Sequence, residues 1–326
     1  MRLVTFRNST DETRLGALID DDSRVIDFLT AEHYHGKDGS ACLRDMQSLI
    51  ESGAEGLAHA AAHVRNPPAP ACMTTSDITL LAPLPVPSQL RCFSVFETHA
   101  RQSGQAMMRY MATQSADPQA TLAAMRESGK FDVPAVFYER PFYYKGNRFS
   151  VTGTDTDIHW PSYSDIVDYE VELAAVIGGT GRDIDHVDAA SYIFGYTVFN
   201  DLSARDEQAR EMVAPLGPAK GKDFDGGNVI GPCIVTADEL VDPYGMRMQA
   251  FVNDVMWSDS HSSGMTHTFE TMIAYVSRSE TIHPGELFVS GCAGSGCGLE
   301  LGRYPNRGDT ISVSIESIGT IRNRII

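Results

Sequence analysis

The sequence predicts a mixed α+β fold that consists mostly of β-sheet, with a small N-terminal domain followed by a larger second domain. The clearest sign is two-fold alternation near the C-terminus, where Ile311, Val313 and Ile315 alternate with polar residues. A second sign is the apolar run at 171–178, which is rich in β-branched residues and ends at a glycine. The Ala- and Met-rich stretch at 100–135 is the main exception and predicts helix.

The N-terminal domain is predicted to span residues 1–75. Residues 3–28 have the pattern of short strands, with a hairpin turn at Asp20–Ser23 between two apolar segments. Residues 40–64 are richer in Ala, Leu and Glu and predict a pair of helices. Proline-rich runs lie on both sides of the boundary, so we assign residues 76–326 to the second domain.

Residues 100–135 differ from the strand-rich sequence around them. Methionines stand there among Ala and polar residues, which predicts one or two helices inserted directly after His99. Methionine side chains adapt to different neighbours, and inserts of this kind often close over active sites as lids. A helix that is simply packed against the sheet explains the pattern equally well, and both interpretations stay open.

Three acidic residues lie at or near the ends of two predicted strands. Glu170 and Glu172 are two apart in a run otherwise fit for burial, so their carboxylates share one strand face. Asp201 ends the next apolar run along the chain. Buried carboxylates need a compensating cation, and an all-oxygen set favours Mg²⁺, Mn²⁺ or Ca²⁺ over zinc. Two glutamates at this spacing, with no other signal, more often line the solvated face of a strand. The basic residues that follow in the sequence favour a metal site instead.

Basic and amide side chains follow the third carboxylate. Arg205 and Gln208 are three apart in a predicted helix and therefore share a face. Lys220 and Lys222 stand in a loop held by Gly and Pro. These groups beside an acidic cluster predict a metal site for an anionic, oxygen-rich substrate. Arg205 could also pair with a neighbouring Asp on a helix surface, and that interpretation stays open.

Four separated segments carry a family resemblance. In chain order they read DYEVELAAVIG (168–178), GYTVFNDLSARDEQ (195–208), PLGPAKGKDF (215–224) and GSGCGLELGR (294–303). Through these motifs, which are distributed along most of the chain, the sequence resembles the fumarylacetoacetate hydrolase family. The resemblance implies a catalytic domain built as a mixed β-sheet roll or barrel, a divalent metal, a homodimer, and action on β-diketo or 2-oxo acids.

The resemblance also implies roles for particular side chains. The metal ligands would be Glu170, Glu172 and Asp201. The substrate would contact Arg205 and Gln208. The catalytic residues would be His99 as general base, Glu300 as the group that orients it, and Lys222 as the cationic stabiliser. The ion would be Mg²⁺ or Mn²⁺, with Ca²⁺ as a third option.

The chain departs from the family pattern in three places. Cys92 stands where the founding hydrolase has an aspartate ligand, and a neutral thiol is a poor ligand for a hard ion. Gln102 stands where smaller relatives have a Glu, and Ser290-Gly291-Cys292 replaces a Ser-Gly-Thr segment. We therefore expect three protein carboxylates on the metal and leave the exact substrate open.

The reaction that the resemblance favours is hydrolysis of a C–C bond in an acylpyruvate-type acid, in aromatic or sugar acid catabolism. His99 would activate water, and Lys222 would stabilise the oxyanion and the released enolate. Decarboxylation of a 2-oxo acid, or dehydration or hydrolysis of a 2-keto-3-deoxy sugar acid, could use the same site. A homologue that binds a ligand without catalysis is the competing interpretation from another functional class.

Composition limits the partners. The 326 residues carry a net charge of −17, which argues against nucleic acid and anionic membranes. No apolar run is long enough for a membrane span, and the N-terminal residues show no signal-peptide core. The six cysteines include no C-x-x-C pair. We therefore expect free thiols, a cytoplasmic location, and a small oxo acid as the ligand.

Overall fold

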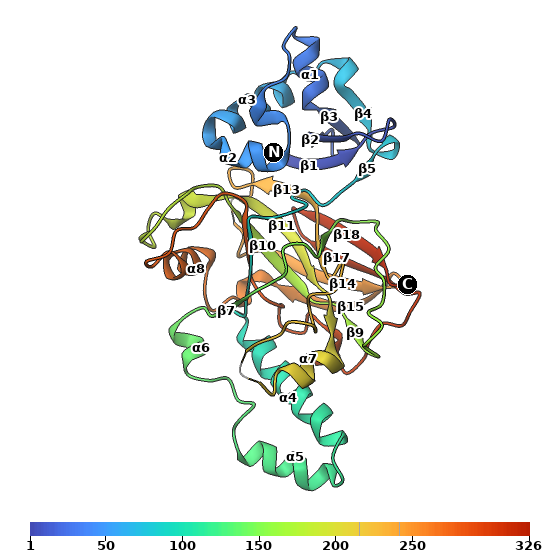
Figure 1. The fold of residues 1–326 in the computed structure, drawn as a ribbon, viewed down its shortest axis with the longest axis vertical. Helices are drawn as coiled ribbons and strands as arrows, with labels where there is room; N and C mark the ends of the chain where they lie inside the picture. The colour runs from blue at the N-terminus through green and yellow to red at the C-terminus, as the bar shows by residue number, and fades with distance from the viewer. Residues whose placement is uncertain (215, 241) are drawn as a thin grey trace.

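The computed structural model describes residues 1–214, 216–240 and 242–326. Pro215, the first residue of the PLGPAKGKDF motif, and Val241 lie outside the described residues. The predicted fold class is confirmed, since strands form most of the body and helices lie at its periphery (Figure 1). The N-terminal strands and helices lie at one end of the long axis, and the helices α4 and α5 lie at the other.

The N-terminal part is an antiparallel sheet covered by short helices. Its strands are β1 (Arg2–Arg7), β2 (Thr13–Ile19), β3 (Arg24–Asp27) and β4 (Cys72–Thr74). Its helices are α1 (Phe28–Tyr34), α2 (Met46–Glu51) and α3 (Gly53–Arg65). Ile19 pairs with Arg24 across the Asp20–Ser23 turn, so the predicted hairpin is confirmed. The predicted helix pair at 40–64 corresponds to α2 and α3.

The N-terminal strands continue directly into the sheet of the main body. β1 pairs with β13 (Asn228–Thr236), which places Arg2 opposite Val235. From β13 the sheet runs in the order β13-β11-β10-β16-β6-β7. These strands are β11 (Ile193–Asp201), β10 (Val171–Ile177), β16 (Glu286–Val289), β6 (Gln89–Phe93) and β7 (Tyr143–Lys145). The sheet is mixed, because β16 and β6 run parallel while most of the other pairs are antiparallel.

A second sheet lies against this one. Its order is β15-β14-β17-β18, and its strands are β15 (Val255–His261), β14 (Arg247–Val252), β17 (Thr310–Ile315) and β18 (Gly319–Arg324). The alternation predicted at 311–315 is confirmed, since the apolar members of β17 are buried. The helix α8 (Phe269–Val276) lies between the strands β15 and β16 in the sequence. Four short strands complete the set: β5 (Thr79–Leu80), β8 (Val151–Thr152), β9 (Val167–Asp168) and β12 (Ser203–Ala204).

The two faces of β10 belong to two different hydrophobic cores. Its odd-numbered residues, including Leu173 and Ala175, pack with the second sheet. Its even-numbered residues Ala174 and Val176 belong to a second core, which reaches into the N-terminal part. All seven residues of β10 are buried. Because side chains alternate along a strand, Glu172 and the preceding Glu170 point toward the second core.

The remaining helices lie around one end of the body. The insert contains α4 (Glu97–Thr113), α5 (Pro118–Glu127) and α6 (Val136–Glu139). The first of these begins earlier than predicted, so His99 lies within its first turn rather than before it. The short helix α7 (Arg205–Glu211) begins within the motif at 195–208, and α9 (Gly298–Leu301) lies within the motif at 294–303. Across the described residues we find no helix with the length and apolar character that a membrane crossing would need.

Candidate active site

Three buried carboxylates meet where β10 begins and β11 ends. The antiparallel register places Val171 opposite Asn200, which brings Glu170 beside Asp201, the last residue of β11. One carboxylate oxygen from each of Glu170, Glu172 and Asp201 lies within 4.8 Å of the others. The three residues are 6%, 1% and 2% exposed. The structure therefore brings together the acidic cluster that was expected from the sequence.

Lys222 supplies positive charge to this cluster. Its Nζ lies 2.8 Å from Glu170 Oε2 and 2.8 Å from Asp201 Oδ2. Tyr144 Oη also donates to Asp201 Oδ2, at 2.7 Å. Two further buried oxygens, Glu172 Oε2 and Asp201 Oδ1, have no hydrogen-bond partner among the described residues. Buried carboxylate oxygens without donors fit a hard divalent cation, which prefers such ligands.

The pKa values reflect the shortage of positive charge. Burial and the nearby Asp201 and Glu170 raise the pKa of Glu172 well above its ordinary value. Burial alone would also raise the pKa of Glu170, but Lys222 and Arg205 lower it. One lysine and one arginine thus satisfy Glu170, whereas Glu172 takes up a proton more readily than an exposed glutamate.

Arg205 is held by carboxylates as well as by its helical neighbour. Its Nε donates to Asp168 Oδ2 at 2.8 Å, and its Nη1 lies 2.8 Å from Glu170 Oε1. Nη1 also donates to Gln208 Oε1 at 2.9 Å, so the predicted common face of Arg205 and Gln208 is confirmed. Arg205 is 3% exposed. The role of these two residues in substrate binding stays a prediction, and the contacts give Arg205 a second role as the counter-ion of two acids.

Asp168 connects the carboxylate cluster to α9. Its two carboxylate oxygens accept hydrogen bonds from the backbone N–H groups of Gly298 and Leu299, at 2.8 and 2.9 Å. Position 298 requires glycine, because a Cβ there would lie 2.5 Å from Asp168 Oδ1 and 2.2 Å from Arg303 O. The contact fixes the short helix that carries Glu300.

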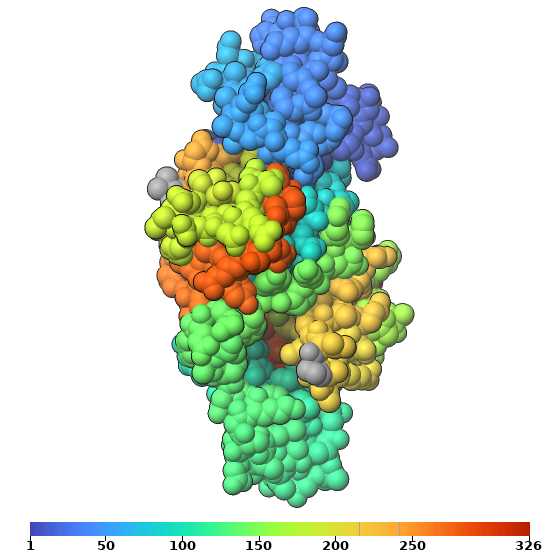
Figure 2. All heavy atoms as spheres, turned by 60° about the vertical axis from the view of Figure 1, so that its left-hand side comes forward, coloured from blue at the N-terminus to red at the C-terminus, as the bar shows by residue number. Residues whose placement is uncertain are grey.

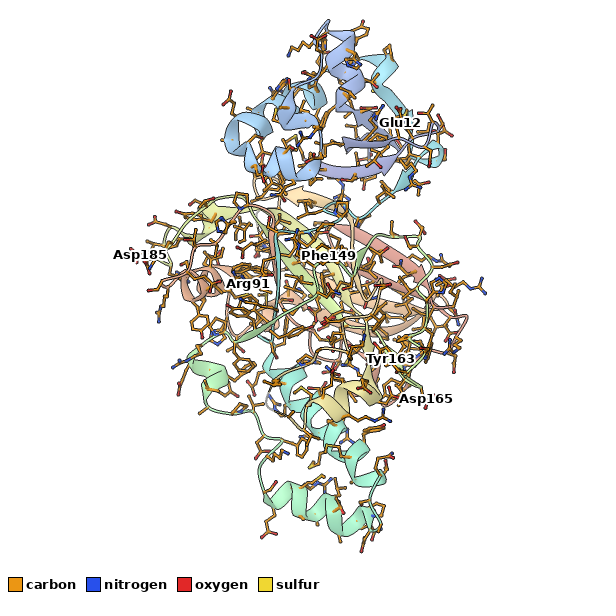
Figure 3. All side chains as sticks on the ribbon, viewed as in Figure 1. Glu12, Arg91, Phe149, Tyr163, Asp165 and Asp185 are labelled. Atoms are coloured by element: carbon orange, nitrogen blue, oxygen red, sulfur yellow. The ribbon has the colours of Figure 1, made fainter. Side chains whose placement is uncertain are left out.

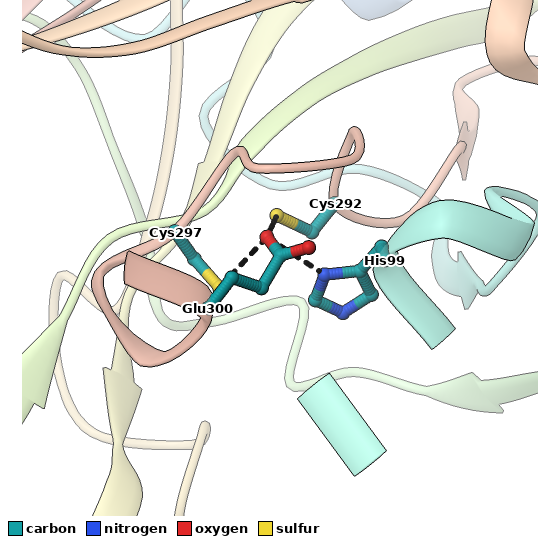
Figure 4. A group of neighbouring side chains, drawn as sticks. All are labelled: His99, Cys292, Cys297 and Glu300. Atoms are coloured by element: carbon teal, nitrogen blue, oxygen red, sulfur yellow. Dashed lines mark hydrogen bonds and ion pairs between the residues drawn. The ribbon is translucent and has the colours of Figure 1, made fainter. Parts of the chain in front are cut away.

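His99 and Glu300 lie close together, as expected from the sequence (Figure 4). The distance from His99 Nδ1 to Glu300 Oε2 is 3.3 Å. The backbone N–H of Ser295 donates to the other oxygen, Glu300 Oε1, at 3.0 Å. Burial lowers the pKa of His99, but contacts with Cys297 and Glu300 outweigh it and raise the pKa well above its ordinary value. The imidazole is therefore oriented by Glu300 and holds a proton strongly.

Most of these side chains face one large cavity, whereas Asp168 and Glu300 lie behind its wall. Its volume is about 930 Å³. Its charged and polar lining includes His99, Lys130, Tyr144, Glu170, Glu172, Asp201, Arg205, Gln208 and Lys222. Figure 2 shows the hollow between the green segment that includes the insert and the yellow segment around α7. Met107, Met111 and Phe131 of the insert also line it, so the insert forms one wall, while its movement as a lid stays a prediction.

Cys92 faces the carboxylates at the end of the second core. It lines the cavity, and burial together with the charges of Asp201 and Glu172 raises the pKa of its thiol. The strand that carries it is anchored by the buried Arg91, whose Nε donates to Glu286 Oε2 at 2.8 Å (Figure 3). A neutral thiol in this position adds no negative charge to the cluster.

Sequence reasoning missed three contributors to the site. Asp168 belongs to the DYEVELAAVIG motif, but nothing in the motif indicates that it would hold both Arg205 and α9. Tyr144 lies in a segment whose sequence suits a strand end or a pocket lining, with no signal for its hydrogen bond to Asp201. Cys297 lies within a glycine-rich segment, and its contact with Glu300 depends on the path of that loop.

Comparison with known proteins gives one family match and several full-length structural likenesses. A family model described as fumarylacetoacetate (FAA) hydrolase, C-terminal, matches residues 115–326, which is more than half of the chain. The matched range includes the carboxylates, Lys222 and Glu300 but begins after His99.

Two solved structures resemble this chain over its whole length, and each match covers 100% of this chain and 99% of the other protein. One is a fumarylacetoacetate hydrolase from Exiguobacterium antarcticum, with 24% identity and a TM-score of 0.73. The other is a maleylpyruvate hydrolase from Sphingobium sp. SYK-6, with 22% identity and a TM-score of 0.71. The second was solved in complex with manganese(II) ion and pyruvate.

Two relatives found by sequence are named as tautomerases rather than as hydrolases. Oxaloacetate tautomerase fahd2, mitochondrial, from Xenopus laevis is 28% identical over 329 residues, which cover 100% of this chain and 90% of that protein. Oxaloacetate tautomerase FAHD2A, mitochondrial, from Homo sapiens is 32% identical over 189 residues, which cover 58% of this chain and 60% of that protein. The match to the human protein thus leaves out a large part of both chains.

We predict that the carboxylate cluster binds one divalent ion. The double variant Glu170→Gln, Asp201→Asn removes two negative charges from the site and should lose most bound Mg²⁺ or Mn²⁺ while the fold persists. Atomic absorption after dialysis measures the stoichiometry, and circular dichroism checks the fold. The matched control is Glu12→Gln, Asp185→Asn, which removes two exposed carboxylates far from the cavity (Figure 3). Undiminished metal in the first variant would show that the assignment is wrong.

We predict that Cys92→Asp tightens metal binding. A carboxylate at this position adds a negative ligand to the cluster and should increase affinity by about 10-fold, or about 1.4 kcal/mol. Calorimetric titration of Mn²⁺ into both proteins measures the change, with Cys92→Ser as the uncharged control. Equal affinities for Cys92→Asp and wild type would mean that position 92 does not reach the ion.

Proposed function

Because this chain belongs to the fumarylacetoacetate hydrolase family, we propose that it is a divalent-metal-dependent enzyme that hydrolyses a C–C bond in an acylpyruvate-type or other β-diketo acid. The observation that carries the proposal is one cavity lined by a carboxylate cluster, by Lys222 and by His99, whose imidazole lies beside the buried Glu300. A binding protein has no need of an oriented imidazole beside a cation site, so the arrangement favours an enzyme.

Glu170, Glu172 and Asp201 would hold the ion, since their unsatisfied buried oxygens suit Mg²⁺ or Mn²⁺. When bound, such an ion supplies Lewis-acid polarisation of neighbouring oxo groups. Arg205 and Gln208 lie on the same wall of the cavity and can receive the anionic end of the substrate. The net charge of −17 makes these local cations important for attracting an acid.

His99 takes a proton from water in this proposal. Glu300 Oε2 faces Nδ1 at 3.3 Å, so the other ring nitrogen is the one that accepts the proton. The raised pKa of His99 means that only the deprotonated fraction of the imidazole acts as a base, so the rate rises with pH until that fraction is complete. Lys222 stabilises the negative charge that develops when the C–C bond breaks.

Keto–enol tautomerisation of a 2-oxo acid is the second candidate. The observation that favours it is the Xenopus relative, a named oxaloacetate tautomerase that matches this chain over its whole length. A protonated His99 suits this reaction, because the imidazolium can donate a proton to carbon or oxygen and recover it without using water. Decarboxylation and sugar-acid dehydration also need no water nucleophile and stay open as reactions of the same site.

Assembly and location are part of the proposal. We propose a homodimer that acts on a small oxo acid, without nucleic acid or membrane partners, in aromatic or sugar acid catabolism. All six cysteines are free thiols, which suits a reducing compartment such as the cytoplasm. Two relatives are named as mitochondrial proteins, so the cytoplasmic location is to be tested by imaging a tagged form of the protein in cells.

The test of the proposal is a substrate panel. Acylpyruvates, oxaloacetate, a maleylpyruvate-type acid and 2-keto-3-deoxy sugar acids are assayed with Mg²⁺ or Mn²⁺, and products are identified by mass. The proposal predicts that an acylpyruvate-type acid gains one water and yields two acids. A product of unchanged mass with loss of the enol absorbance would favour the tautomerase, loss of CO₂ would favour a decarboxylase, and loss of water would favour a dehydratase.

We predict that His99→Ala lowers kcat by about 10²- to 10⁴-fold while bound metal is retained. Glu300→Gln should show a smaller loss, because it weakens the orientation of the imidazole without removing it. His159→Ala, which changes an exposed histidine, is the control. The wild-type rate should rise with pH, and that rise should disappear in His99→Ala. Wild-type turnover in His99→Ala would eliminate the mechanism.

A further inference from the structure

We propose a second metal site, for zinc or a similar thiophilic divalent ion, whose occupation inhibits the reaction. Its ligands are the four side chains drawn in Figure 4: His99, Cys292, Cys297 and Glu300. The binding of zinc rests on the geometry alone, whereas the inhibition also rests on the proposed function. Neither thiol acts on the substrate in the proposed reaction.

The four groups already lie at nearly the spacing that a tetrahedral ion requires. One ligand atom from each residue lies within 4.8 Å of all the others. Glu300 Oε2 lies 3.2 Å from Cys297 Sγ, 3.3 Å from His99 Nδ1 and 4.0 Å from Cys292 Sγ. Ligands about 2.0–2.3 Å from a tetrahedral zinc ion are about 3.3–3.8 Å from one another. Small side-chain movements are therefore sufficient to bind the ion.

The surroundings orient these ligands toward a common point. His99 Nδ1 is buried and makes no hydrogen bond of good geometry to any described residue, although it faces Glu300. The backbone N–H of Ser295 holds Glu300 Oε1, which leaves Oε2 directed at the thiols. Cys292 and Cys297 are 2% and 0% exposed. In structural zinc sites the ligands are likewise buried and held in place by hydrogen bonds from neighbouring groups. The carboxylate of Glu300 and the two buried thiols have this character.

Ligand chemistry separates this site from the carboxylate cluster. The cluster offers only oxygen and favours Mg²⁺ or Mn²⁺, whereas two thiols and an imidazole favour zinc and other softer ions. His99 and Cys292 also line the cavity, so an ion can reach the site from the same opening as the substrate. Zinc bound there displaces any proton from Nδ1 of His99, so the one remaining ring proton lies on the other nitrogen, which then cannot accept a proton from water. One oxygen of Glu300 is also bound to the ion.

The chain offers a useful comparison cluster in its N-terminal part. Glu32 Oε1 lies 2.8 Å from His59 Nε2 and 2.7 Å from His63 Nε2, and Cys42 Sγ lies 3.8 Å from His59 Nδ1. Ser40 donates to the second oxygen of Glu32. These groups satisfy one another by hydrogen bonds, but they include a thiol, so a binding experiment must separate the two clusters.

The binding test uses Co²⁺ as a spectroscopic substitute for zinc, added to the full-length protein with excess Mg²⁺. Wild type and the control Cys42→Ser should show thiolate-to-cobalt charge-transfer absorption, which zinc should abolish by displacement. Cys292→Ser and Cys297→Ser should lose that absorption, and their affinity for zinc should fall by at least about 10-fold. Retention of the band in both of these variants, or its loss in Cys42→Ser, would overturn the site.

A second measurement tests the site even if the Cys292 and Cys297 variants do not fold, because it does not use them. X-ray absorption at the zinc edge of wild type and Cys42→Ser, each loaded with one equivalent, should report two sulfur neighbours at about 2.3 Å. A first shell with only nitrogen and oxygen would contradict the proposal.

The inhibition test follows zinc titration of whichever reaction the substrate panel identifies, at saturating Mg²⁺. Zinc should inhibit wild type and Cys42→Ser alike, and Cys297→Ser should need at least about 10-fold more zinc relative to its own uninhibited rate. If no substrate is turned over while the cobalt band appears as expected, the proposed function fails and the site stands. Turnover that zinc inhibits equally in Cys297→Ser and wild type would refute the inhibitory role.

Discussion

The positive charge that three buried carboxylates require is the constraint that shapes the site. Glu170, Glu172 and Asp201 are almost inaccessible to water, and a buried carboxylate is stable only when it is paired, protonated or bound to a cation. Lys222 and Arg205 satisfy Glu170, and Lys222 also contacts Asp201, but two oxygens lack a partner within the described part of the chain. The divalent ion that we propose would complete the compensation.

The same strands that create this need also position the rest of the machinery. Asp168 stands two residues before Glu170, accepts hydrogen bonds from Arg205, and fixes α9 through the backbone of Gly298. Since α9 carries Glu300, and Glu300 lies beside His99, the segment from Asp168 to Glu172 positions both the carboxylates and the partner of the imidazole. The thiol of Cys297 approaches Glu300 from the same loop. The base and the proposed zinc site therefore depend on the same local packing as the carboxylates.

Local sequence pattern predicted some of this arrangement and could not predict other parts. The two-residue spacing of Glu170 and Glu172 indicates a shared strand face, and the structure has it, because strand periodicity is a local property. The contact of Lys222 with Asp201 depends on how a loop returns across the sheet, which periodicity does not show. The family resemblance implied a cationic role for Lys222 but not this contact. The hydrogen bond from Tyr144 and the start of α4 before His99 were likewise set by tertiary packing.

The position of the ion is the decisive observation for the carboxylate site. Crystals grown with Mn²⁺ and oxalate, measured at a wavelength where manganese scatters anomalously, give the position of the metal without reference to activity. We predict a single strong peak within coordination distance of Glu170, Glu172 and Asp201. A peak at His99 and Cys297 instead, or no ordered manganese in the cavity, would contradict the conclusion that the buried carboxylates form the metal site.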